Sequence, residues 1–146
     1  MSELYLVARI AGQALAIPSD HVGSVVDVAE ITPVPRMPRH LLGLAALRSR
    51  VVTVIDTPVL LGLAHSCAGN PRAVVVDGEG HSYALLVDRV EDVVGLERCA
   101  PGDAIEAAWM RVARGSVERG GTPIPVVDPA AILALLVAPQ GSVSID

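Results

Sequence analysis

Apolar, glycine, aspartate and proline positions recur in the two halves of this chain about 70 residues apart. An offset of 68 residues aligns Gly12, Ala16, Ile17, Asp20, Val22, Val25, Val26 and Pro33 with Gly80, Ala84, Leu85, Asp88, Val90, Val93, Val94 and Pro101. An offset of 72 residues aligns Val54, Asp56, Leu60 and Leu61 with Val126, Asp128, Ile132 and Leu133. Chance would align some apolar residues, but the coincident Gly, Asp and Pro positions favour a true repeat. The same unit made twice predicts two small β-lobes packed face to face.

The composition indicates that the repeated unit is built from strands. The chain is 51% hydrophobic but has no Phe and only 2% aromatic residues, so Val, Leu, Ile and Ala must form its core. β-Branched residues favour strands, and 13 Gly and 11 Pro divide the chain into short segments. We therefore predict a mainly β domain with many turns.

Short apolar runs between turn residues predict the individual strands. The expected strands are residues 4–10, 14–18, 72–76, 83–87, 90–96, 109–114 and 123–127, and residues 20–28 fit either a helical turn or a strand. Asp128 as N-cap and Pro129 at the first helical position predict a short C-terminal helix to about Val137. Asp56 is the matching cap of the first half. The predicted organisation is one domain at 1–138, with lobe one at about 12–64, lobe two at about 72–128, and a loose tail at 139–146. The N-terminal strand and the C-terminal helix are expected to pack on the lobes.

The stretch 41–63 carries the most prominent charged feature, Arg48-Ser49-Arg50 between two apolar runs. The runs predict two strands that meet at a solvent-exposed turn. Arg48 and Arg50 lie two residues apart, so an extended chain would point both side chains the same way. Arginine at such a turn is usually solvated, but arginine also anchors interfaces by binding carboxylates. Both interpretations stay open at this point.

No motif in the sequence indicates an enzyme or a metal site. Asp56-Thr57-Pro58 resembles the Asp-Thr-Gly of aspartic proteases, but Pro58 replaces the glycine on which that turn depends. The four histidines are far apart in sequence and none lies beside a cysteine, which favours surface histidines. We therefore expect no catalytic residue, cofactor or metal.

Charge, hydropathy and the cysteines argue for a cytoplasmic protein. The net charge is −5 and there is no basic stripe with aromatic residues, so we expect no nucleic-acid partner. No apolar run reaches the roughly 20 residues that span a bilayer, and the N-terminus lacks the pattern of a signal peptide. Cys67 and Cys99 are far apart and are interpreted as reduced thiols.

The segment GLAALRSRVVTVIDTPVLLGL resembles the signature of CheW-like domains, the coupling fold of bacterial chemotaxis. In that signature a Gly and an aliphatic run precede Asn-Leu-Arg-Gly and a strand that ends in Pro-Val-Val-Asp-Leu. Four further blocks match in the right order: LVARIAGQALAIPSDHVGSVV, ITPVPRMPRHLLGL, HSYALLVDRVEDVVGL and RGGTPIPVVDPAAILALL. The resemblance therefore covers nearly the whole chain.

The resemblance implies two five-stranded β-barrel-like lobes on a shared apolar core, and a non-catalytic adaptor. Such an adaptor would couple the cytoplasmic tip of chemoreceptors to the regulatory domain of a CheA-type histidine kinase in a signalling array, without inserting into the membrane. The receptor tip would bind in a groove between the lobes, and Arg48, Val22 and Ser24 would contribute to it. Arg50 is a possible further partner contact.

The chain departs from the family pattern at positions that bear on partner choice. Ala46 replaces the signature Asn, Ser49 replaces the Gly after Arg48, and Ser24 stands where an acidic residue is common. The alternative function is therefore a CheW-like module that binds a CheA-type kinase or regulator in a non-flagellar pathway, without chemoreceptors.

Overall fold

The computed structural model describes residues 3–28, 30–36, 38, 40–47, 50–62, 72–78, 80–99, 109 and 111–137. Its strands are β1 (Glu3–Ile10), β2 (Gln13–Pro18), β3 (Ser24–Asp27), β4 (Leu41–Leu47), β5 (Arg50–Ile55), β6 (Arg72–Gly78), β7 (His81–Val87), β8 (Arg89–Leu96), β9 (Arg98–Cys99), β10 (Ala113–Arg119) and β11 (Thr122–Val127). Its helical elements are η1 (Ser19–His21), α1 (Thr57–Leu60) and α3 (Pro129–Val137).

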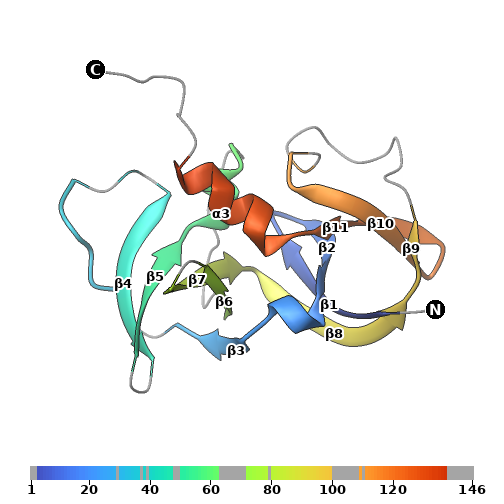
Figure 1. Cartoon of the computed structure of the whole chain (residues 1–146), viewed down its shortest axis with the longest axis horizontal. Helices are drawn as coiled ribbons and strands as arrows, with labels where there is room; N and C mark the ends of the chain where they lie inside the picture. Colours follow the sequence, from blue (N-terminus) through green and yellow to red (C-terminus); the bar gives the residue numbers. More distant parts are fainter. Residues whose placement is uncertain are drawn as a thin grey trace.

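The strands form two curved sheets that lie side by side (Figure 1). The six-stranded lobe has the order β8-β1-β2-β11-β10-β9, and the five-stranded lobe has the order β3-β6-β7-β5-β4. Apart from the two-residue β9, each lobe has five strands, which confirms the predicted barrel-like pair. Helix α3 lies over the boundary between the lobes (Figure 1).

The two lobes exchange hairpins between the halves of the sequence. The β1–β2 hairpin of the first half pairs with β8 and β11 of the second half, and the β6–β7 hairpin of the second half pairs with β3 and β5 of the first. The registers are equivalent, because Val54 pairs with Ala84 in one lobe and Val126 pairs with Ala16 in the other. Each sheet therefore contains strands from both halves of the sequence. The predicted lobe boundaries, 12–64 and 72–128, do not describe this exchange.

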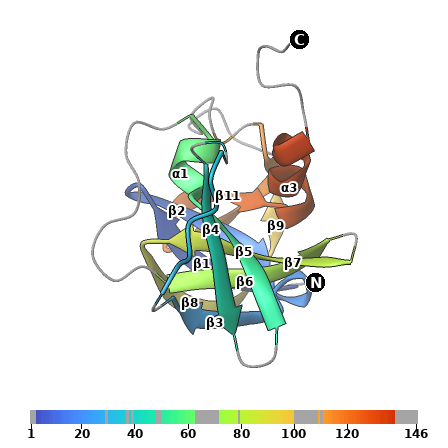
Figure 2. The ribbon, with the colours of Figure 1, turned by 90° about the vertical axis from the view of Figure 1, so that its left-hand side faces the viewer.

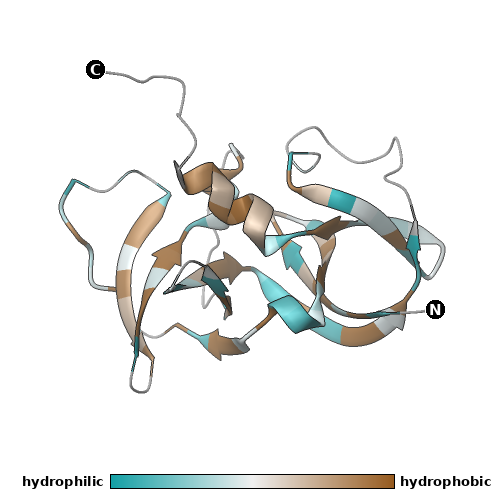
Figure 3. Ribbon diagram, in the orientation of Figure 1, coloured by the Kyte–Doolittle hydropathy of each residue, from teal (hydrophilic) through white to brown (hydrophobic). Residues whose placement is uncertain are grey.

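Each lobe has a small inner core, and a larger core lies between the lobes. The inner core of the six-stranded lobe consists of Tyr5, Val7, Ala16, Val117, Ile124 and Val126. The inner core of the five-stranded lobe consists of Ala45, Val52, Val54, Ala73, Val75, Ala84 and Leu86. The two repeat offsets place every member of the first list on a member of the second. Apolar residues of both sheets and of α3 form the core between the lobes (Figure 3).

Successive residues of a strand face opposite sides of the sheet, so alternate residues of one strand pack into different cores. In β1, Tyr5 and Val7 point into the lobe, whereas Leu6, Ala8 and Ile10 point into the core between the lobes. Strands with both faces buried read as continuous apolar runs, which is why the sequence contains so many of them.

The two predicted helix caps differ in the structure. The Asp128 carboxylate accepts a hydrogen bond from the backbone N–H of Ala130 at 2.9 Å, as an N-cap should. Asp56 occupies the N-cap position of α1, but its side chain makes no capping hydrogen bond. Pro58, at the second position of α1, has no N–H to donate, so the contact that Asp128 makes with Ala130 is impossible here. Asp56 is nevertheless buried, with 4% of its surface exposed.

Most predicted strands lie where the sequence places them, with two revisions. Residues 20–28 contain both of the proposed alternatives, since η1 is followed two residues later by β3. The strand predicted at 109–114 begins only at Ala113, and Trp109 is a buried helical residue that packs in the core between the lobes. The tail predicted at 139–146 lies outside the described residues.

Candidate partner-binding groove

A groove of about 460 Å³ opens between the two edges of the five-stranded lobe. The described residues that line it are Ser24, Val25 and Val26 of β3, Ala46 and Leu47 of β4, Arg50 of β5 and Val75 of β6. Strands β3 and β4 are the opposite edges of one curved sheet, and Figure 2 views this face of the molecule. The floor reaches Val75 of the inner core, so the groove is an apolar opening into the lobe.

Arg50 supplies the positive charge of this groove. Its Nη1 lies 3.6 Å from Oδ1 of Asp77, and the Ser82 hydroxyl donates to the same carboxylate oxygen at 2.7 Å. The side chains of Arg50 and Asp77 are 53% and 61% exposed, so water screens this ion pair and it contributes little to stability. The guanidinium can therefore exchange Asp77 for a carboxylate of a partner at small cost.

The β4–β5 hairpin beside the groove exposes apolar surface. Ala46 pairs with Val51, and Val51 is 62% exposed, one of the three large apolar side chains with high exposure in the described part of the chain. Isolated exposed valines are common in soluble proteins. Here the residue adjoins an apolar groove and Arg50, a combination that is typical of an interaction surface.

The structure brings together some of the predicted site residues. Ser24 and Arg50 line the same groove, but this groove lies within the five-stranded lobe, whereas the predicted receptor groove lies between the lobes. Val22 is half-buried against the core between the lobes and is not among the described residues of the groove. Arg48 and Ser49 lie outside the described residues, so the predicted contact of Arg48 stays a prediction.

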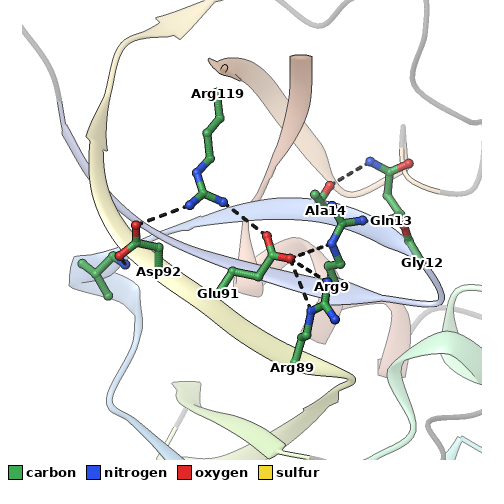
Figure 4. A network of polar contacts seen from close by, with 9 residues as sticks. Arg9, Gly12, Gln13, Ala14, Arg89, Glu91, Asp92 and Arg119 are labelled. Carbon is green, nitrogen blue, oxygen red and sulfur yellow. Dashed lines mark hydrogen bonds and ion pairs between the residues drawn. The ribbon is translucent and has the colours of Figure 1, made fainter. Parts of the chain in front are cut away.

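A second, smaller opening of about 290 Å³ lies in the six-stranded lobe, lined by Val7, Arg9, Ala14, Glu91, Arg119, Thr122 and Ile124. Three arginines converge there on the carboxylate of Glu91 (Figure 4). Arg9 Nε lies 2.7 Å from Glu91 Oε2, Arg89 Nη2 lies 3.1 Å from the same oxygen, and Arg119 Nη1 lies 3.2 Å from Oε1. Arg119 also reaches Asp92 at 3.3 Å.

These contacts hold Glu91 in its charged form. The hydrogen bond from Arg9 lowers the pKa of the Glu91 carboxyl, and Arg89 acts in the same direction, whereas partial burial opposes both. Sequence analysis did not single out Arg9, Glu91 or Arg119, because they are distant in sequence. The repeat could have pointed to Arg119, because it aligns this charged residue with the apolar Leu47 of the other half.

A second polar contact ties β9 to β1 in the same lobe. The buried Tyr5 hydroxyl donates to Glu3 at 2.6 Å and accepts from Nε of Arg98 at 3.1 Å, and the Arg98 guanidinium lies 5.9 Å from the ring centre. Burial raises the pKa of Tyr5, and the hydrogen bond to Tyr5 raises the pKa of Arg98. Both side chains therefore keep these protonated forms at neutral pH.

The described residues contain no group of three or more His, Cys, Asp or Glu side chains that could hold a metal ion. Within the same residues, no helix has the length and apolar character needed to cross a membrane.

Comparison with known proteins decides the family. The sequence model of the CheW-like domain matches residues 4–137. The chain belongs to the CheW-like domain family. It is 25% identical over 134 residues to the chemotaxis protein CheW of Thermotoga maritima, covering 91% of this chain and 89% of that protein. It is 30% identical over 97 residues to protein FrzA of Myxococcus xanthus, covering 66% of this chain and 59% of FrzA.

The fold agrees with this assignment. The crystal structure of the scaffolding protein TtCheW from Thermoanaerobacter tengcongensis superposes with a TM-score of 0.73 at 22% identity, covering 87% of this chain and 89% of that one. Members of the CheW-like family are non-catalytic scaffolds, and this chain is one of them.

Proposed function

We propose that this CheW-like protein is a non-catalytic adaptor that couples chemoreceptors to a CheA-type histidine kinase in a chemosensory array. The observation that carries the proposal is the family match across residues 4–137, which includes the signature segment around Arg48. The protein would work in the cytoplasm and join membrane-bound arrays through its partners.

The groove supports a role for the five-stranded lobe in receptor binding. Its apolar walls would receive aliphatic side chains of a receptor tip, and Arg50 would meet a carboxylate at the rim. The signature Arg48, two residues before Arg50, would provide the anchoring contact, with Ser24 on the opposite wall. The regulatory domain of the kinase, which resembles this fold, would bind the protein lobe to lobe.

Two residues of the groove favour a second candidate function. Ser24 and Ala46, which both depart from the common family pattern, line the groove. A changed groove would suit a changed partner, so the protein would bind a CheA-type kinase or regulator in a non-flagellar pathway without chemoreceptors.

A pull-down from the native cell separates the two candidates and tests Arg48. The adaptor captures both a CheA-type kinase and a chemoreceptor, whereas the alternative captures the kinase alone. Arg48→Glu is expected to keep an unchanged thermal transition while weakening assembly by about 1–2 kcal/mol, roughly tenfold in affinity. Arg111→Glu is the matched control, because Arg111 is an exposed arginine just before β10 in the other lobe. Capture of both partners by Arg48→Glu at the wild-type level would contradict the anchoring role.

A further inference from the structure

The two openings described above occupy equivalent places in the two lobes. The repeat offsets align Val75, Leu47 and Arg50 of the larger groove with Val7, Arg119 and Thr122 of the smaller opening. Strands β3 and β4 bound the first, and their equivalents β8 and β10 flank the second. Each opening leads to the inner core of its lobe, at Val75 in one case and at Val7 and Ile124 in the other.

The side chains at equivalent positions differ in charge. Glu91 and Arg119 of the six-stranded lobe align with Gly23 and Leu47 of the five-stranded lobe. Glu91 of β8 and Arg119 of β10 therefore face each other across the seam between the two strands, where the other lobe has only hydrogen and an aliphatic side chain. The Arg119 guanidinium bonds Glu91 at 3.2 Å and Asp92 at 3.3 Å, so it joins β10 to two residues of β8 (Figure 4).

The other contacts of Glu91 hold its carboxylate in place for this bond. Arg89 lies on β8 itself, and Arg9 lies on the neighbouring β1, so neither of them crosses the seam. The Glu91 side chain is only 19% exposed, against 38% for Arg119. An ion pair in such a network, with one partner largely buried, is less screened than an isolated surface pair.

The inner cores of the two lobes also differ, in the size of their side chains. Tyr5 of the six-stranded lobe aligns with Ala73, and Val117 aligns with Ala45, so this lobe is filled by larger side chains. Its opening is correspondingly smaller, about 290 Å³ against about 460 Å³. Larger core side chains and the ion pair thus both narrow the opening of the six-stranded lobe relative to that of the five-stranded lobe.

We infer that Arg119 and Glu91 form a latch that narrows, in the six-stranded lobe, the groove that its twin leaves wide. The latch makes a nearly symmetric scaffold functionally asymmetric, with only one of these two grooves wide enough to admit bulky apolar groups. The identity of the partner that fills the wide groove rests on the proposed function, whereas the narrowing of the other groove does not. Arg119→Leu, which installs the residue of the twin lobe, should widen the second groove.

The test uses 8-anilinonaphthalene-1-sulfonate, an apolar anion, as a probe of open apolar grooves. We expect Arg119→Leu to bind at least one more probe molecule than wild type by fluorescence titration. In ¹H–¹⁵N spectra the additional binding should shift the amides of Val7 and Ile124, which the probe leaves unchanged in wild type. Arg89→Leu is the control, because it removes a charge beside Glu91 without breaking the bond across the seam.

Three outcomes would each overturn the latch. In the first, Arg119→Leu folds but binds no additional probe. In the second, the Val7 and Ile124 amides of the wild-type protein already shift with the probe, and in the third, the Arg89→Leu control gains the same binding site. If Arg119→Leu fails to fold, the double variant Glu91→Ala/Asp92→Ala, which removes both β8 partners of Arg119, takes its place and should give the same result. None of these measurements requires a kinase or a receptor, so they stand apart from the proposed function.

Discussion

Gly43 shows how one residue of the signature segment is set by backbone geometry. Its φ of +143° lies in a region that side chains rarely adopt, and a Cβ there would collide with the carbonyl of Thr32. The close approach matters because Thr32 forms a bridge with Leu44, which brings the loop after β3 onto the edge of β4. Gly43 thus lets this loop pack against β4, the strand that supplies Ala46 and Leu47 to the groove.

We predict that Gly43→Ala lowers the free energy of unfolding by about 2–6 kcal/mol, combining backbone strain of about 1–3 kcal/mol with steric overlap of similar size. Gly12→Ala is the matched control, because Gly12 has a φ of +82° but open space around its Cβ. Its cost should stay near 1 kcal/mol. Chemical denaturation of both variants measures the difference, and equal losses would show that the contact with Thr32 is unimportant.

At the residue scale, the sequence predicted positions better than contacts. Asp56 and Asp128 were both placed correctly before a helix, but only Asp128 caps with its side chain. The difference follows from the position of one proline, since Pro58 removes the N–H that Ala130 supplies in the other half. Such a local rule could have been applied to the sequence alone.

At the scale of elements, the Glu91 carboxylate joins β1, β8 and β10, and its ionisation makes the stability of the fold depend on pH. Arg9 lowers the pKa of Glu91 below its ordinary value of 4.5, so the charged form is favoured in the folded state. The resulting stability is present above the pKa of the unfolded chain and is lost as the pH falls through the lower folded pKa.

We therefore predict that Glu91→Gln is less stable than wild type at pH 7 and that the difference shrinks below about pH 4.5. Thermal unfolding between pH 3 and pH 7 measures it. Glu118→Gln is a suitable control, because Glu118 is an exposed residue of β10 that pairs through its backbone with Pro123 of β11. A Glu91→Gln deficit that stays constant to pH 3 would contradict the role of the charge.

The arrangement of the elements was only partly predictable. Apolar periodicity located the strands and the repeat, but it does not specify which strand pairs with which. The exchanged hairpins therefore emerged only in the structure, where Val54 pairs with Ala84 and Val126 with Ala16. Likewise the Glu91 network joins residues 82 and 28 positions apart, a separation at which charge patterns in sequence carry no information.

At the scale of the whole molecule, a duplicated β unit has become two lobes with different surfaces. The shared core between the lobes makes them one body, since Trp109, α1 and α3 pack there with residues of both sheets. The five-stranded lobe keeps an open apolar groove with Arg50 at its rim, and the six-stranded lobe carries the ion-pair network. This division suits a scaffold that must present distinct surfaces to distinct partners.

Co-sedimentation tests the central claim most directly. Purified protein, a CheA-type kinase and chemoreceptor-containing membranes from the same cell are mixed, and the membranes are pelleted. We predict that the kinase enters the pellet with this protein present, that much less enters in its absence, and that Arg48→Glu reduces the recovery roughly tenfold. A kinase that stays in the supernatant with wild-type protein, or an adaptor that never pellets with the membranes, would contradict the coupling function.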